Sequence, residues 1–187
     1  MLHGTSIIFD LEASCWQREL GSEEAYKQDH QMEVIEIGAV KVDKNFNVLD
    51  TFEILCKPRL NPILTEFCTT LTTIQQSDVD NAPDFIDAYR AFLKWAGHVQ
   101  CFIAWGFYDF KQIDLQLARE GFNDARPKPY KNGKDLVKEW AGYKGKGLGK
   151  EAQRHKLEFE GIRHRGLADA KMVNQVLKAT WKKNTNP

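Results

Sequence analysis

The chain has 187 residues, 42% of them hydrophobic and 28% charged, and its formal net charge is zero. This length suits one well-buried domain of a globular protein, over residues 1–187. No apolar run approaches the roughly 18 residues that span a bilayer, and the N-terminus lacks a basic-then-apolar signal. The four cysteines lack the spacing and density of a disulfide scaffold. These features predict a cytoplasmic protein with reduced thiols and no membrane contact.

The zero net charge hides an uneven distribution along the chain. Residues 1–110 contain 8 Lys and Arg against 17 Asp and Glu, a balance of −9, whereas residues 111–187 contain 18 against 9, a balance of +9. This split is compatible with a metal site beside a phosphate-binding surface. It is also compatible with two oppositely charged halves that simply attract each other.

The first predicted element is a strand over residues 6–13, Ser-Ile-Ile-Phe-Asp-Leu-Glu-Ala. Its consecutive bulky apolar residues suit a strand buried on both faces. Side chains alternate along a strand, so Asp10 and Glu12 should point to the same face at its end. Like charges repel, and an unpaired buried carboxylate is costly. The pair therefore indicates a bound divalent cation, or else a strand that emerges into solvent at this point.

The next segments predict a loop and a hairpin. Residues 15–31 are polar and poor in helical pattern, with Trp16 either packing on the core or stacking on a base. Residues 33–42 alternate at near period two, residues 43–47 have turn chemistry, and residues 48–56 form the returning strand. We expect this hairpin to pair with the first strand and to form an antiparallel edge of the sheet.

A loop and a long amphipathic helix follow the hairpin. Residues 57–62 contain two prolines and predict a loop, with short helical turns over residues 65–77. Ala82-Pro83-Asp84 opens a helix with proline in its first turn and Gly97 at its end. The helix has one apolar stripe, formed by Phe85, Ile86, Tyr89, Phe92, Leu93 and Ala96.

Residues 99–105 predict another apolar strand, which leads into a helix over residues 108–120 that stops at Gly121. Asp109 therefore lies where a core strand passes into a helix. In open α/β sheets this edge is where ligands bind.

The following stretch is basic and rich in turns. Residues 127–134 predict a linker, residues 135–143 a short helix and residues 149–159 a further helix. The run Lys-Gly-Lys-Gly-Leu-Gly-Lys at residues 144–150 does not fit a Walker A loop. It is either a flexible basic loop beside a nucleic-acid path or a solvated connector.

The sequence His-Arg-Gly-Leu-Ala-Asp-Ala, residues 164–170, opens a final helix that continues to about Lys182. His164 lies just before this helix and Asp169 in its first or second turn. Both side chains can therefore face the same spot, near the positive end of the helix dipole.

Four acids would converge if the strands that carry them are neighbours: Asp10, Glu12, Asp109 and Asp169. Oxygen ligands favour a hard ion such as Mg²⁺ or Mn²⁺. Four carboxylates can hold two such ions roughly 3.5–4 Å apart, the arrangement of two-metal phosphoryl transfer. His164, with an ordinary imidazole pKa near 6.5, suits removal of a proton from the attacking water. The predicted chemistry is metal-assisted hydrolysis of a phosphodiester.

Three ordered motifs resemble those of the DEDDh 3′–5′ exonucleases. They are Phe-Asp-Leu-Glu-Ala-Ser (residues 9–14), Trp-Gly-Phe-Tyr-Asp (105–109) and His-Arg-Gly-Leu-Ala-Asp-Ala (164–170). Residues 67–80 resemble the branch that contains the histone-mRNA exonuclease and the bacterial KapD-like proteins. The resemblance runs from about Ser6 to Lys178. It implies a ribonuclease-H-like (DnaQ-like exonuclease) α/β fold, with a central mixed sheet and helices on both faces.

By this resemblance Asp10, Glu12, Asp109 and Asp169 would be the metal ligands of two ions and His164 the general base. The substrate would be single-stranded nucleic acid, with RNA favoured, and the product a nucleoside monophosphate. The substrate-binding candidates are Ala13, Trp16, Leu71, Thr72 and Phe107. Two departures from the family pattern, Thr73 in place of glycine and Phe110 in place of methionine, would affect the nucleotide pocket without touching the metal ligands.

Two alternatives remain open from the sequence. One is a DNA-directed proofreading or repair exonuclease. The other is a catalytically silent RNA-binding module on the same fold. The sequence leaves the oligomeric state open.

Overall fold

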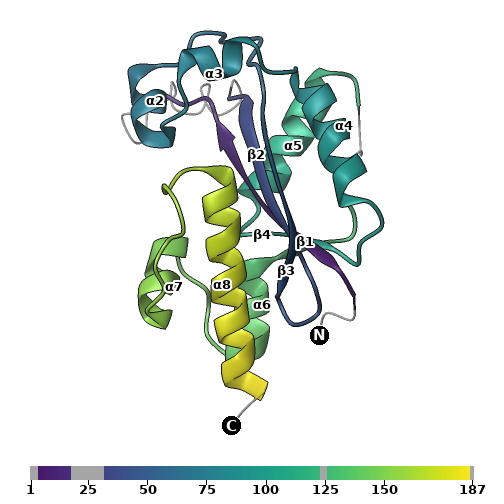
Figure 1. Cartoon of the computed structure of the whole chain (residues 1–187), viewed down its shortest axis with the longest axis vertical. Coiled ribbons are helices and arrows are strands. Elements are labelled where there is room, and N and C mark those ends of the chain that lie inside the picture. Colours follow the sequence, from purple (N-terminus) through teal and green to yellow (C-terminus); the bar gives the residue numbers. More distant parts are fainter. Residues whose placement is uncertain (1–3, 18–31, 123–125, 186–187) are drawn as a thin grey trace.

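The computed structural model describes residues 4–17, 32–122 and 126–185, with the side chains of the last three left out (Figure 1). A five-stranded mixed sheet runs in the order β3-β2-β1-β4-β5. β1 pairs antiparallel with β2 and parallel with β4, β2 pairs antiparallel with β3, and β4 pairs parallel with β5. The strands are β1 (Ser6–Ala13), β2 (Val34–Val42), β3 (Val48–Leu55), β4 (Phe102–Ala104) and β5 (Tyr130–Asn132).

Helices cover both faces of this sheet, which confirms the expected ribonuclease-H-like layout (Figure 1). Odd-numbered apolar residues of β1 pack against α4 and α5, whereas Ile8 packs against α6 and α8. Asp10 and Glu12 continue the face of Ile8, because side chains alternate along a strand. The helices are α2 (Glu66–Thr72), α3 (Gln76–Asp80), α4 (Phe85–Ala96), α5 (Tyr108–Arg119), α6 (Gly133–Ala141), α7 (Leu148–His155) and α8 (Gly166–Thr185).

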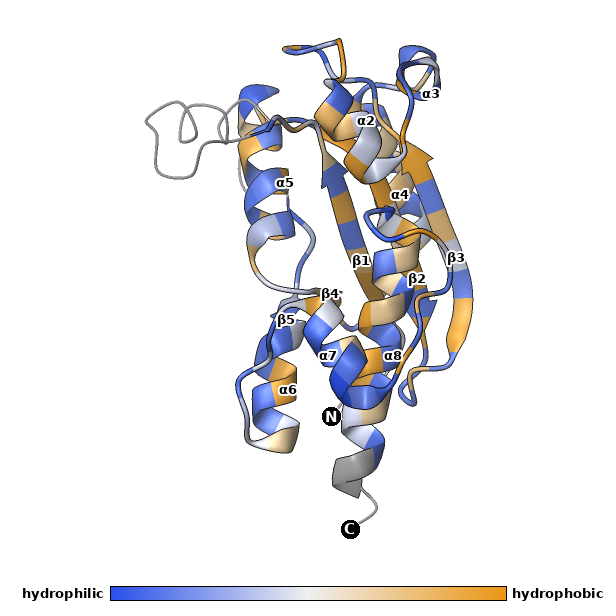
Figure 2. Ribbon diagram, turned by 90° about the vertical axis from the view of Figure 1, so that its left-hand side faces the viewer, coloured by the Kyte–Doolittle hydropathy of each residue, from blue (hydrophilic) through white to orange (hydrophobic). Residues whose placement is uncertain are grey.

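The predicted hairpin and the predicted amphipathic helix are confirmed. β2 and β3 form the hairpin, and β3 lies at one edge of the sheet (Figure 2). In α4, Phe85, Tyr89 and Phe92 are at most 3% exposed and pack on the sheet. The Asp84 side chain caps this helix by accepting a hydrogen bond from the Asp87 amide. Pro83 therefore precedes the cap, whereas the sequence predicted it within the first turn.

The fourth and fifth strands differ from the sequence prediction. The strand expected over residues 99–105 is limited to β4, and residues 127–134, expected as a linker, contain β5. The Phe102 amide donates to the Pro129 carbonyl over 2.9 Å, and the two strands pair from there. A three-residue strand next to prolines is too short to show an alternating sequence pattern. It forms because its backbone can hydrogen-bond to β4. The helix expected over residues 149–159 is α7, which ends earlier because Lys156 is left-handed (φ 55°).

Trp16 is half-buried and packs against the cluster of Ala13, Leu64 and Cys68, as the core interpretation predicted. The rest of the loop, residues 18–31, lies outside the described residues. The four cysteines, all within the described residues, are buried and form no disulfide bond. None of the described helices is long and apolar enough to cross a membrane.

Candidate active site

Two glycines allow the start of α8 to lie directly on β1 and β2. A Cβ atom added to Gly38 would be 1.9 Å from the Leu167 nitrogen, and one added to Gly166 would be 2.8 Å from the Gly38 nitrogen and 3.0 Å from the Asp10 carbonyl oxygen. Atoms cannot approach that closely, so only glycine fits at either position. The contact brings the turn before α8 over the end of β1 that carries Asp10.

A buried ion pair fixes the same turn. Glu36 lies opposite Glu12 in the β1–β2 register, and its side chain is fully buried. Its carboxylate accepts hydrogen bonds from Arg165 Nη2 (2.6 Å) and Nε (3.0 Å) and from the Gly166 amide (2.7 Å). Arg165 also reaches Glu53 at 3.3 Å. The paired charges and the backbone bond hold the residues around His164 against the sheet.

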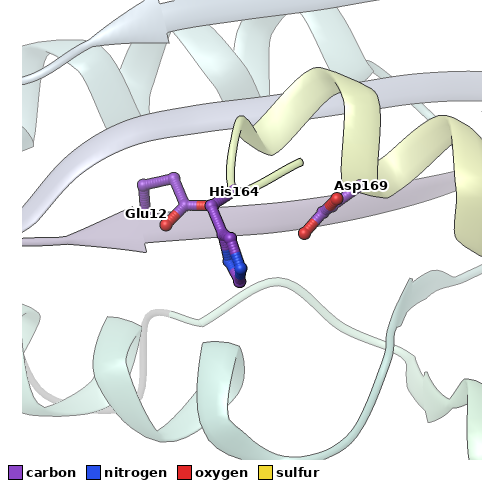
Figure 3. A group of neighbouring side chains, drawn as sticks. All are labelled: Glu12, His164 and Asp169. Carbon is purple, nitrogen blue, oxygen red and sulfur yellow. The ribbon is translucent and has the colours of Figure 1, made fainter. Parts of the chain in front are cut away.

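His164 itself has a left-handed backbone (φ 61°). One turn later the Asp169 amide donates to the Arg165 carbonyl over 2.9 Å, which closes the first turn of α8. The side chains of His164 and Asp169 lie at the start of α8 and point into the same space (Figure 3).

Glu12, His164 and Asp169 form a compact group (Figure 3). One ligand atom from each lies within 4.8 Å of the other two, a spacing that suits a shared metal ion. Asp169 Oδ1 is shielded from solvent and has no hydrogen-bond partner among the described residues. An orphaned carboxylate oxygen that faces other acids is the feature that a bound cation would explain.

Asp109 reaches the same part of β1 from the start of α5. It is the second residue of α5, just after β4 as predicted, and is 5% exposed. Its Oδ1 accepts a hydrogen bond from the Leu11 amide over 3.1 Å, and Leu11 is the residue between Asp10 and Glu12 in β1. Burial raises the pKa of Asp109 to about 6, against the lowering effect of that amide.

The four acids lie close enough to one another to raise each other's pKa. Burial, followed by the charges of Asp109, Glu12 and Asp169, raises the pKa of Asp10 well above its usual range. Burial and the charge of Asp169 raise the pKa of Glu12 to about 8. Burial also raises the pKa of Asp169, although the nearby His164 opposes the shift. The convergence of the four acids expected from sequence is therefore present, from β1, α5 and α8.

This donor set fits a hard divalent cation. All four acids offer oxygen ligands, and their mutual repulsion in a shielded site is relieved by positive charge. Such a site, with an imidazole at its border, can activate a water molecule toward a phosphodiester.

The substrate-binding candidates lie in different places. Ala13 and Leu71 contact the same apolar cluster near the end of β1. The Thr72 hydroxyl is buried, donates to the Cys68 carbonyl and accepts from the Ile74 amide, so it shapes the end of α2. Phe107 is 56% exposed and borders a hollow at β5 whose lining includes none of the four acids.

The structure also explains the two departures from the family pattern. Thr73 is left-handed (φ 63°), the conformation that glycine adopts most easily. Phe110 is fully buried and packs edge-on against Phe9, with ring centroids 5.2 Å apart. Phe110 therefore belongs to the core and not to a surface pocket.

Sequence reasoning missed Glu36, Arg165 and the two glycines. A charged residue and a glycine inside an otherwise apolar strand were the available signals, since both are unusual there. Their partners lie about 130 residues away along the chain, and no local pattern indicates them.

The chain is similar to known exonucleases in sequence and in fold. The family described as Exonuclease (RNase_T) matches residues 7–177. The chain is 28% identical to "ERI1 exoribonuclease 2" of Homo sapiens, over 94% of this chain and 28% of that protein. It is 23% identical to "3'-5' exonuclease eri1" of Schizosaccharomyces pombe, over 95% of this chain and 68% of that protein. The chain thus spans less than a third of the length of the human relative.

Solved structures share the fold. The nuclease domain of 3'hExo, a DEDDh family member bound to rAMP, superposes with a TM-score of 0.83 at 21% identity, over 96% of this chain and 92% of that one. Pop2p of S. pombe, in a form with Mg²⁺ and Mn²⁺ bound, gives a TM-score of 0.66 at 16% identity, over 92% and 81%. With a family match over nearly its whole length, the chain belongs to the RNase_T exonuclease family, as its three motifs predicted.

Proposed function

We propose that this chain is a metal-dependent 3′–5′ exonuclease that hydrolyses single-stranded RNA and releases nucleoside monophosphates. The observation that carries the proposal is the meeting of Asp10, Glu12, Asp109 and Asp169 beside His164. Family membership and the exoribonuclease names of the relatives support it. We further propose that residues 1–187 act as one exonuclease domain in the cytoplasm.

Each of the five residues has a proposed role. The four acids hold two divalent cations, Mg²⁺ or Mn²⁺, which when bound would lower the pKa of a water molecule and stabilise the departing oxygen. His164 accepts the proton of that water. The water oxygen forms a bond to phosphorus while the bond from phosphorus to the 3′-oxygen of the preceding nucleotide breaks. A positioned base of this kind contributes about 10²–10⁴-fold in rate.

The 3′-terminal nucleotide would rest against the apolar residues near the end of β1, Ala13 and Leu71, with Thr72 shaping the floor. Phe107 and the exposed part of Trp16, which also packs on the core, are the proposed stacking partners for bases, because aromatic faces bind bases of any sequence. The name of the human relative, "ERI1 exoribonuclease 2", favours RNA over DNA as the substrate.

The test is digestion of end-labelled single strands in the presence of Mg²⁺ or Mn²⁺. We expect stepwise shortening from the 3′ end, which stops with chelator and in the Asp10→Ala variant and slows by about 10²–10⁴-fold in His164→Ala. Matched RNA and DNA strands separate an RNA enzyme from a DNA enzyme, since the 2′-hydroxyl distinguishes them. Strands that bind but stay intact with every divalent ion would favour the silent binding module.

A further inference from the structure

A basic pocket lies beside His164 and Asp169. It has a volume of about 790 Å³ and is bordered by the loop before α7, the first turns of α7 and the segment before α8. Its polar lining residues are Lys146, Lys150, Gln153, Arg163, His164 and Asp169. α7, which carries part of this wall, packs against α8, the helix that carries Asp169 (Figure 2). The pocket is therefore continuous with the candidate active site.

The glycine- and lysine-rich loop is held in place and is not a loose connector. The fully buried Glu151 carboxylate accepts hydrogen bonds from the Lys146 amide (2.9 Å) and the Tyr143 hydroxyl (3.0 Å). The Trp105 indole donates to the Lys146 carbonyl over 3.0 Å. A Cβ atom on Gly145 would lie 3.0 Å from the Lys134 Cα, so this loop position packs against backbone. Such anchoring fixes where the lysines of the loop emerge.

The cations of the pocket are available to a ligand. Lys146, Lys150 and Arg163 are exposed, and within the described part of the chain the two lysines form no ion pair. The Arg163 guanidinium lies over the Phe159 ring at 5.2 Å and is a close neighbour of Gly149. A glycine at 149 leaves that space to the guanidinium. The wall thus carries three positive charges, and Asp169 is the one acid among the lining residues.

The chemistry of the proposed reaction decides which part of a strand these charges suit. The departing nucleotide carries one phosphate, the scissile one, and that phosphate must lie at the four acids. A second cluster of cations beside the acids therefore suits the phosphates that precede the scissile bond. We propose that the basic pocket of Lys146, Lys150 and Arg163 binds the RNA backbone on the 5′ side of the scissile phosphate, an inference that rests on the proposed function.

The experiment measures the KM of the full chain, in the presence of Mg²⁺, for two substrates. One is a single-stranded 12-mer RNA, and the other is the p-nitrophenyl ester of a nucleoside 5′-monophosphate, which has no phosphate before its scissile bond. In Lys146→Gln/Lys150→Gln we expect the KM for the 12-mer to rise on the order of tenfold relative to the KM for the ester. The slope of log KM against log salt should fall by about 1.4, since each phosphate contact on a single strand contributes roughly 0.7.

A matched control removes two exposed lysines elsewhere, in Lys44→Gln/Lys94→Gln. Lys44 lies in the turn at the opposite end of β2, and Lys94 lies on α4 across the sheet. We expect the control to keep the wild-type ratio of the two KM values and the wild-type salt slope.

Two results would overturn the pocket assignment: equal KM changes for strand and ester, or a salt slope the same as that of the control. If the wild type cleaves neither substrate, the proposed function fails. The pocket is then tested by the fluorescence anisotropy of a labelled 12-mer. Equal affinities of the two double variants for that strand would refute backbone binding.

Discussion

At the scale of single residues, the candidate site depends on charges outside the acid cluster as much as on the acids. Glu36 is completely buried, and its carboxylate is bound by Arg165 and by the Gly166 amide. Its charge still acts on the neighbouring acids, since it contributes to raising the pKa of Asp10, Glu12 and Asp169. The same ion pair sets the turn from which His164 projects.

Removal of the Glu36 carboxylate should therefore damage both stability and the site. In Glu36→Ala we expect the free energy of unfolding to fall by about 3 kcal/mol, because Arg165 loses a buried partner. Strand hydrolysis should fall as well, since the His164 turn loses its anchor. Urea denaturation measures the first effect, and the rate of shortening of a labelled strand measures the second.

Glu53→Ala is the matched control, because Glu53 contacts the same Arg165 from a side chain that is 42% exposed. Exposed ion pairs contribute about 0–1 kcal/mol. Equal losses of stability in the two variants would show that the buried bonds of Glu36 have no special role.

At the scale of elements, the decisive contact is the one between the start of α8 and the middle of β2. The helix carries Asp169, and β1, which pairs with β2, carries Asp10 and Glu12. The distance between these acids is thus set by how closely a helix end can approach a sheet. Glycine at positions 38 and 166 gives the closest approach that backbone atoms allow.

A methyl group at position 38 should lift the helix from the sheet. We expect Gly38→Ala to lower stability by about 1–3 kcal/mol or more, because backbone atoms would have to move. Hydrolysis should decrease further than stability alone explains, since Asp169 and His164 move with the helix. Thermal melting and strand digestion at a temperature where the variant remains folded separate the two effects.

Gly4→Ala is a suitable control, because an added Cβ there has its nearest neighbour at 3.8 Å. We expect this control to melt close to the wild type. Wild-type rates in a stably folded Gly38→Ala protein would contradict the role given to the close approach.

At the scale of the whole molecule, the uneven charge of the sequence has a spatial counterpart. The acidic part of the chain supplies Asp10, Glu12 and Asp109, and the basic part supplies the lysines of the pocket beside them. The acids are brought together at the cost of repulsion, which the folded protein bears as long as no cation is bound. This cost should appear in the pH dependence of stability.

Without divalent ions the protein should become less stable as the pH rises. Folding raises the pKa of Glu12 from its usual 4.5 to about 8, so the folded protein keeps a proton that the unfolded chain releases. The free energy of unfolding contributed by this group is therefore lost as the pH rises between those values. We expect a lower melting temperature in chelator at pH 8 than at pH 5.5.

Mg²⁺ should raise the melting temperature more at pH 8 than at pH 5.5, because it binds the ionised acids. Glu12→Gln removes one titrating group and should flatten the dependence measured in chelator. A melting temperature in chelator that rises from pH 5.5 to pH 8 would contradict this account of the acid cluster.

Local patterns in the sequence determined the first strand with its two same-sided acids, the β2–β3 hairpin, the buried stripe of α4 and the place of Asp109 at the start of α5. These features follow from alternation, turn chemistry and helical spacing, which act over a few residues. Only the tertiary structure decided that residues 130–132 form a strand, that Glu36 binds Arg165, and that the loop at 144–150 borders His164. Those depend on contacts between residues far apart along the chain, whose energy appears only when the partner surface has folded.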